Sequence, residues 1–219
     1  STGSSYSLFG RITYAYDNRY LLTANFRNDA SDIFAPGKRS AFFPSVSIGW
    51  NIANEKFFKV EKINDLKLRF GIGEIGNNSI DKNWWSQEYK LQTNGTWLAQ
   101  KTPNKDVTWE KTRITNIGID LGAWNNAFTA TIDLYNKKTR DALIEQKLPS
   151  TIGVGSNTYK LNKGEISNKG IELALSYRGS INHFNYLVSG NISYNKNKVL
   201  NIGNASYLSG GNFNRTLVN

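Results

Sequence analysis

The sequence predicts an all-β chain folded as an antiparallel up-and-down meander, and three observations support this prediction. Apolar and polar residues alternate with a period of two through about eight segments. The 219 residues include 11 Tyr, 11 Phe and 6 Trp but only 4 Pro, a composition that suits sheet better than helix. Short and long connections alternate along the chain, as they do when hairpins return to two opposite ends of one sheet.

Each strand is predicted from the same alternation. In residues 19–27 (RYLLTANFR), Leu22 falls on one face and Asn25 on the other. We expect one face of the sheet to meet lipid, through Leu22, Ile48, Leu68, Ile119, Ile132 and Leu173. We expect the other face to line a wet interior, through Asn25, Arg69, Asp120, Asp133, Glu172 and Asn191. A charge on the lipid face near the bilayer midplane would cost about 2–4 kcal/mol, which makes the opposite orientation unfavourable.

The connections predict where the two ends of the sheet lie. The shorter ones, at residues 17–19, 54–64, 123–127 and 179–183, are expected at one end, and the long ones, at 28–40, 77–106 and 147–164, at the other. Aromatic residues gather near the short-turn end: Tyr14, Tyr16, Tyr20, Trp50, Trp124, Phe128, Tyr177, Phe184 and Tyr186. Short turns, long loops and an aromatic girdle together indicate part of a transmembrane outer-membrane β-barrel.

Composition argues against several kinds of function. The chain has no cysteine and one histidine, His183, so we expect no metal centre, no cofactor and no catalytic residues. An oxygen-only calcium site at Asp29 and Asp32 stays open. The net charge of +10 is dispersed and does not form the stripe typical of nucleic-acid binding. No apolar run of about 18 residues predicts a membrane helix.

Residues 71–76 (GIGEIG) match the glycine spacing of dinucleotide-binding loops. That motif requires a helix opening at its third glycine, because the helix N-terminus holds the phosphates. The residues that follow, NNSIDKNWW, carry no helical period. The glycines therefore need a different explanation.

Several segments together resemble the barrel of SusC/RagA-like TonB-dependent outer-membrane receptors. They are LFGRITYAYDNRYLLTANFRNDASDIF, FFPSVSIGWNIANEKFF, INDLKLRFGIGEIGNN, VTWEKTRITNIGIDLGAWNNAFTATIDLYNKKTRDALIEQKLPSTIG, EISNKGIELALSYRG and NISYNKNKV. The resemblance implies location in the outer membrane of a Gram-negative, Bacteroidota-like bacterium, and import of glycans or peptides. It also implies a SusD-like lipoprotein partner and an energy supply from TonB through a plug domain. Within it, Gly71 and Gly73 are expected on the lumen side of a strand, and Gly76 at the start of an extracellular loop.

We expect residues 1–219 to be a partial receptor barrel of about eight strands, without plug or barrel termini. Candidate ligand-binding residues are Trp84, Trp85 and Trp97 in the longest connection, and Arg69 and Arg178 on the polar face. Aromatic faces suit sugar rings or peptide side chains in a wet cavity, and the arginines suit an acidic ligand. The tryptophans also suit a structural role, packing the loop against itself or against a partner lipoprotein, and the arginines suit pairing with carboxylates of a plug.

Three alternatives stay open at this point. About eight strands can close by themselves into a small pore or adhesin. A soluble β-sandwich could bind glycans through Trp84, Trp85 and Trp97. An enzyme would need a pair such as Glu88 and Asp106, or Glu110, but these carboxylates lie in or beside a long loop and no spacing fixes their separation.

Overall fold

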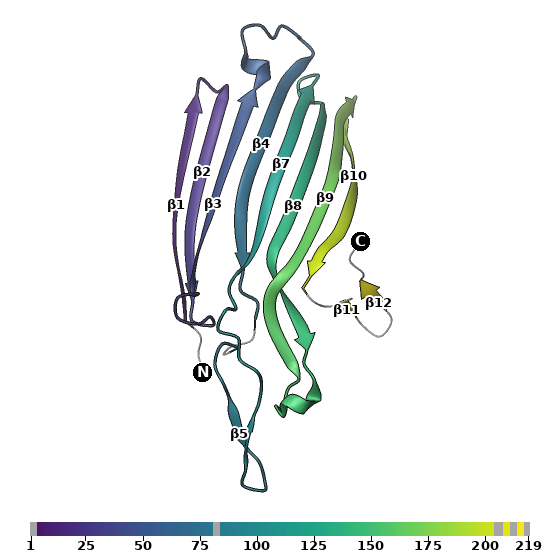
Figure 1. Cartoon of the computed structure of the whole chain (residues 1–219). Helices are drawn as coiled ribbons and strands as arrows, with labels where there is room; N and C mark the ends of the chain where they lie inside the picture. The colour runs from purple at the N-terminus through teal and green to yellow at the C-terminus, as the bar shows by residue number, and fades with distance from the viewer. Residues whose placement is uncertain (1–3, 81–83, 204–207, 211–213, 217–219) are drawn as a thin grey trace.

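The computed structural model is dominated by one long antiparallel sheet, from whose lower end the connecting loops project (Figure 1). It describes residues 4–80, 84–203, 208–210 and 214–216. The main sheet has eight strands, in the order β1 (Ser5–Tyr16), β2 (Tyr20–Ser31), β3 (Ser40–Asn51), β4 (Ile63–Asn77), β7 (Glu110–Ala123), β8 (Phe128–Lys147), β9 (Thr158–Ile181) and β10 (Phe184–Ile202). Each strand pairs with its neighbour along the chain, which confirms the predicted meander.

Four further short strands lie outside the main sheet. β5 (Tyr89–Leu91) and β6 (Trp97–Ala99) form a hairpin within the longest connection, and β11 (Leu208–Gly210) pairs with β12 (Asn214–Thr216). Two single 3₁₀ turns, η1 (Ile52–Asn54) and η2 (Ser150–Ile152), complete the secondary structure. No helix in the described ranges is long and apolar enough to cross a membrane.

The predicted ends of the connections are confirmed. The backbone N–H of Asn125 donates to the side chain of Asn64 at 2.6 Å, and that of Arg178 donates to the carbonyl of Ala127 at 2.7 Å, so these connections lie side by side. The turns use residues that tolerate positive φ, with Asn18 at 49° and Asn182 at 53°. The long connections leave from the opposite end of the sheet (Figure 1).

Some predicted boundaries were wrong. Residues 147–164 were predicted as a connection; β8 ends at Lys147 as predicted, but β9 already begins at Thr158, so only residues 148–157 connect the two strands. β8 has 20 residues and β9 has 24, about twice the 9–11 that a membrane-spanning strand needs. The connection predicted at 28–40 likewise shortens, because β2 runs to Ser31.

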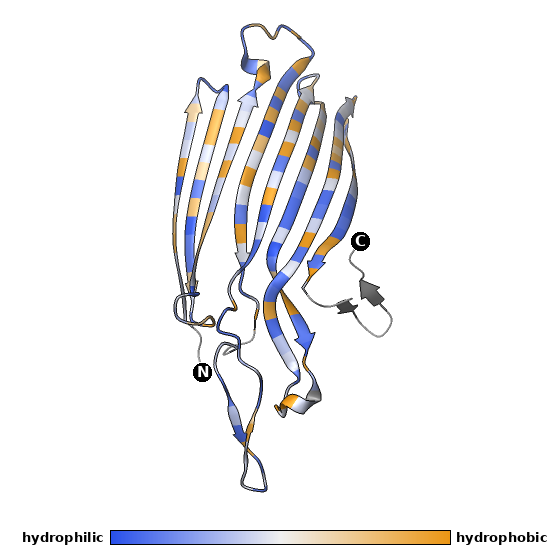
Figure 2. Cartoon of the chain, viewed as in Figure 1, coloured by the Kyte–Doolittle hydropathy of each residue, from blue (hydrophilic) through white to orange (hydrophobic). Residues whose placement is uncertain are grey.

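The strand register confirms the two predicted faces. Leu22 lies opposite Ile48, and the row Leu68, Ile119, Ile132 and Leu173 crosses four neighbouring strands. Figure 2 shows the resulting alternation of apolar and polar residues along each strand. The apolar side chains are exposed in the isolated chain, with Ile48 at 51% and Ile192 at 70%. A continuous apolar face of this size suits lipid rather than water.

The aromatic residues of the short-turn end lie in contact with one another. Ring centroids are 6.4 Å apart for Tyr16 and Tyr20, and 6.0 Å apart for Trp124 and Phe128. Tyr20 also lies opposite Trp50 in the register. The predicted gathering of aromatic residues at this end is confirmed.

Glu55, just after η1, joins two short connections to this aromatic group. Its carboxylate accepts hydrogen bonds from the Tyr20 hydroxyl at 2.7 Å, the Trp50 indole at 2.9 Å and Arg19 at 3.1 Å. Only 8% of the Glu55 side chain is exposed. Because Tyr20 first and then Trp50 donate to the charged form, the pKa of Glu55 lies below its ordinary value.

These contacts predict a stability that depends on pH. The contribution of Glu55 to the free energy of unfolding is complete above the pKa that a glutamate has in the unfolded chain. It is lost as the pH falls through the lower pKa of Glu55 in the folded protein. We expect Glu55→Gln to lower the melting temperature of the full-length protein at neutral pH, and the difference from wild type to shrink as the pH is brought from about 7 to about 3. A difference that stays constant over this range would contradict the prediction.

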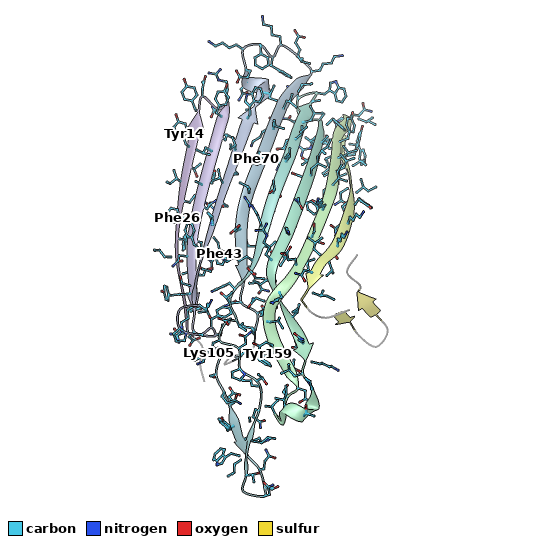
Figure 3. All side chains as sticks on the ribbon, in the orientation of Figure 1. Tyr14, Phe26, Phe43, Phe70, Lys105 and Tyr159 are labelled. Carbon is cyan, nitrogen blue, oxygen red and sulfur yellow. The ribbon has the colours of Figure 1, made fainter. Side chains whose placement is uncertain are left out.

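The hydrophobic core lies at the long-loop end of the sheet. Phe34, from the β2–β3 connection, is 1% exposed and packs with Ala41, Phe43, Val107 and Trp109. The Trp109 ring lies 5.4 Å from Phe34 and 5.6 Å from Phe43, between ring centroids. Figure 3 labels Phe43 at the lower part of the sheet, above the gathered loops. The core therefore anchors the long connections to the strands.

Gly76 belongs to this region and not to a loop, so its predicted position was wrong. β4 continues to Asn77, and a Cβ atom added to Gly76 would overlap the Phe43 ring. Gly71 and Gly73 lie opposite Ser47 and Ser45, on the polar face as expected. The glycines of GIGEIG thus belong to a strand, and at Gly73 and Gly76 side chains of β3 approach the backbone closely.

Candidate ligand-facing site

Arg69 lies at the centre of an ion network on the polar face of the sheet. Its guanidinium donates to both carboxylate oxygens of Asp120, at 2.7 Å and 3.0 Å, and lies 3.1 Å from a carboxylate oxygen of Asp133. Thr131 also donates to Asp120, at 3.2 Å. Arg69 is on β4, Asp120 on β7 and Asp133 on β8, so the network crosses three strands.

Gly118 makes room for this network. It lies between Arg69 and Asp133 in the register, and a Cβ atom at Gly118 would meet the guanidinium at 2.7 Å. The carboxylates that balance Arg69 therefore come from the wall itself. Two carboxylates facing one guanidinium leave little positive charge for an acidic ligand.

A shallow hollow of about 370 Å³ adjoins Arg69 on the same face. Small residues of three neighbouring strands keep it open, among them Ser47, Gly49 and Gly71. Lys67 and Asn116 add polar groups at its sides. The hollow is a polar depression in the wall with one lysine and the paired Arg69 beside it.

Trp84 is held between two lysines and is half-buried. The Lys101 and Lys160 ammonium groups lie 5.3 Å and 4.7 Å from its ring centroid, within range of cation–π attraction. Lys101 also pairs with Glu88 at 3.2 Å, and Lys160 with Glu145 at 3.3 Å. Since Lys160 belongs to β9, these contacts tie the longest connection to the β8–β9 hairpin.

Trp85 and Trp97 have different surroundings. The indole N–H of Trp85 is buried, and no acceptor for it lies within the described part of the chain. Trp97 is 67% exposed on the β5–β6 hairpin, opposite Leu91, with Tyr89 on the same face. These three exposed side chains form an apolar hairpin face, defined here as Tyr89, Leu91 and Trp97, at the far end of the longest connection (Figure 1).

The five predicted site residues do not form one site. The three tryptophans share the connection between β4 and β7 at the long-loop end, whereas Arg178 is an exposed residue at the short-turn end, where its N–H bonds to Ala127. Arg69 lies on the wall between the two ends. The predicted set thus divides into a loop group, a wall residue and a turn residue.

The carboxylates considered for catalysis are paired separately. Glu88 pairs with Lys101, Asp106 lies 3.9 Å from Lys38, and Glu110 accepts from the Leu143 N–H at 3.3 Å. Asp29 of the possible calcium site pairs with Arg27 at 2.6 Å. Within the described residues, no group of three or more His, Asp or Glu side chains is placed to hold a metal ion.

Sequence reasoning missed the residues that order the long connections. The Asn162 side chain exchanges hydrogen bonds with the backbone of Thr108 at 2.9 Å and donates to the Asp141 carbonyl at 2.7 Å. The Trp109 indole donates to the Arg39 carbonyl at 2.9 Å. The apolar pair Val107 and Trp109, spaced two apart just before β7, was a usable signal, but no local pattern marks Asn162.

The geometry defines a class of protein. A single meander with one exposed apolar face, one polar face carrying ion pairs, short turns at one end and long packed loops at the other is part of the wall of a membrane β-barrel. Residues 1–216 match the family described as TonB dependent receptor-like, beta-barrel, and the chain belongs to that family.

Individual relatives agree with this assignment. The TonB-dependent receptor SusC of Bacteroides thetaiotaomicron is 35% identical over 207 residues, which cover 88% of this chain and 20% of SusC. A TonB-dependent receptor of Formosa agariphila is 34% identical over 211 residues, covering 92% of this chain and 21% of that protein. The chain thus spans about a fifth of the length of these curated relatives.

Solved structures show the same fold. The RagAB peptide importer in its open-open state superposes with a TM-score of 0.87 at 26% identity, covering 99% of this chain and 24% of that one. Its closed-closed state gives a TM-score of 0.85 at 28% identity, covering 95% and 24%. The chain is therefore a SusC- and RagA-like barrel segment, and proteins of this family are outer-membrane receptors and transporters.

Proposed function

We propose that residues 1–219 form part of the barrel wall of an outer-membrane transporter that imports glycans or peptides, drawing energy from TonB through a plug domain. The observation that supports this most directly is the division of one sheet into an apolar and a polar face. The apolar face suits lipid, and the polar face suits a solvated passage or a plug. The likeness to SusC and to a peptide importer supports both the class of cargo and a SusD-like lipoprotein partner.

The other candidate folds receive less support. The sheet order runs from β1 to β10, and in the described residues these two strands do not pair with each other, so the eight strands do not close as a small pore would. A sandwich needs a second large sheet over the apolar face, and the described strands outside the main sheet form only two short pairs.

Trp97 is the best candidate for contact with cargo or partner among the predicted residues. Its ring is open, whereas Trp84 is engaged by two lysines. An exposed tryptophan beside Tyr89 and Leu91 offers a flat apolar platform for a sugar ring or an apolar side chain. Arg69 and Arg178 have lesser roles in this proposal. Arg69 is paired with two carboxylates, and Arg178 lies at the short-turn end, opposite the long loops.

The test is uptake by the intact receptor in a host strain, with glycans and peptides supplied separately. We expect Trp97→Ala to lower uptake of the cognate cargo about tenfold, which is typical of losing a central aromatic contact. Receptor abundance should stay normal, since two thirds of Trp97 is exposed and it belongs to no buried core of the described residues. Trp84→Ala serves as the comparison and should reduce receptor abundance before it reduces uptake per receptor. Normal uptake by Trp97→Ala at normal abundance would remove this residue from the proposal.

A further inference from the structure

The outward face of β8, β9 and β10 changes from apolar to polar towards the long loops. The register places Leu134, Ile171 and Tyr194 in one apolar row on the face expected to meet lipid. The next row towards the long loops holds Asn136, Lys169 and Lys196. The row after that is Lys138, Ser167 and Lys198. Two consecutive polar rows, rich in lysine, therefore border the apolar face.

Distance along the strands places these lysines at the edge of the membrane. The eight to ten steps from Phe128, at the aromatic end, to the rows of Asn136 and Lys138 cover roughly 27–34 Å at about 3.4 Å per residue, which is about 20–26 Å of height for a strand tilted by about 40°. The apolar band of an outer-membrane barrel is about 25 Å tall. Lysine side chains are long enough to lie along apolar surface and place their ammonium groups among lipid headgroups. The long loops of such barrels are extracellular, so this boundary is that of the outer leaflet.

Most of the charge in these rows is uncompensated. Lys138 pairs with Glu165 at 2.9 Å. Lys169, Lys196 and Lys198 are exposed, and none of them forms an ion pair with a carboxylate of the described residues. Three ammonium groups on two adjacent strands form a basic rim, a name used below for Lys169, Lys196 and Lys198.

Two adjoining hollows follow these rows. One, of about 420 Å³, lies among Lys138 and the basic rim. The other, of about 520 Å³, adjoins it on the side of the short-turn end and is bounded by Ile117, Leu134, Ile171 and Tyr194. The two share Asn136, Lys169 and Lys196, so a cationic depression continues into an apolar groove.

We propose that this surface binds an outer-leaflet lipid with a phosphorylated headgroup, which places its phosphate on the basic rim and an acyl chain in the adjoining apolar groove. The order of the groups matches such an amphiphile: unpaired cations at the boundary, then a groove with little polar surface on the lipid side. A lysine ammonium binds phosphate as a point charge, without fixed orientation, which suits a mobile headgroup. The inference rests on the proposed membrane orientation and not on the identity of the cargo.

The test uses the purified full-length receptor and two probes with identical acyl chains, lipid A and its dephosphorylated form. Native mass spectrometry measures how much of each the receptor retains. Each lysine near an anionic lipid surface favours binding about fivefold. We expect the triple variant Lys169→Gln, Lys196→Gln, Lys198→Gln to lower the ratio of phosphorylated to dephosphorylated lipid at least about tenfold.

A matched control removes the same charge elsewhere. Lys90→Gln, Lys105→Gln, Lys147→Gln changes three exposed lysines of the long-loop end and should leave the lipid ratio unchanged. Resistance of the folded barrel to unheated detergent on a gel shows that both variants fold. An unchanged ratio in the rim variant, or an equal fall in the control, would overturn the proposal. So would a change of oligomeric state in the rim variant, because it would assign this face to a second copy of the receptor. Failure of cargo uptake alone would not bear on it.

Discussion

Trp109→Ala is expected to lower the free energy of unfolding of the long-loop end by roughly 3–5 kcal/mol, the usual cost of removing a large aromatic from a core. Trp109 is buried, contacts the rings of Phe34 and Phe43, and donates its indole N–H to the Arg39 carbonyl. Its loss would remove the group that joins the β2–β3 connection to the start of β7. In the full-length receptor, limited proteolysis between residues 78 and 109 should become much faster, while the strands stay resistant.

Trp97→Ala is the control for Trp109→Ala. It deletes the same side chain from the same connection, but from an exposed position, so its effect on proteolysis should be small. Equal acceleration by both variants would show that the connection is ordered by its tip and not by the core around Trp109.

Arg69→Ala is expected to cost roughly 1–3 kcal/mol, because it leaves Asp120 and Asp133 facing each other without their shared cation. The estimate is below that for a fully buried ion pair, because all three side chains are about a third exposed. The melting temperature of the intact receptor is the measurement.

Neutralising the carboxylates should rescue part of this loss. In the Arg69→Ala background, Asp120→Asn with Asp133→Asn removes the repulsion and should restore much of the lost melting temperature. The single substitution Lys67→Ala is a suitable control, since Lys67 lies on the same face of β4 but forms no ion pair within the described residues. No rescue by the double neutralisation would mean that Arg69 acts through its packing alone.

Local alternation was enough to predict the faces and the ends of the sheet. Leu22, Ile48 and Ile132 needed only the two-residue period of a strand and the cost of charge in lipid. The contact between Glu55 and Trp50 was harder to predict, because it depends on how the turn after β3 folds back. No sequence pattern around Glu55 indicates this contact.

The early start of β9, at Thr158, could not be read from the same signal. Asp141 adopts a φ of 55°, and the pairing of β8 with β9 is interrupted between Thr139 and Leu143 before it returns to the same register. An irregularity of this kind is set by the contact between the two strands, and residues 158–164 alone do not show that they pair beyond it.

The candidate site shows the same limit. Trp84 and Trp97 are equivalent by sequence, since both lie in one polar connection. Lys160, 76 positions after Trp84, is one of the two cations that engage its ring, and that contact exists only because the connection folds against β9. Arg69 contacts Asp120 diagonally, one row away from its direct partner, Gly118. Contacts set by the stagger of neighbouring strands cannot be predicted from the sequence of either strand alone.

The neighbour-to-neighbour order of the strands also bears on how such a wall is assembled in a bilayer. Every pair in the main sheet joins consecutive long strands, so each new strand finds its partner already in place. The widest gap, residues 78–109 between β4 and β7, adds only about 2 kcal/mol of closure entropy over a three-residue turn. Backbone groups left unpaired in hydrocarbon cost several kcal/mol each, which penalises a wall with several open edges at once. Hairpin-by-hairpin growth adds strands at one advancing edge, so the polar groups of this sheet that must be sheltered during insertion are those of the newest strand and of the outer edge of β1.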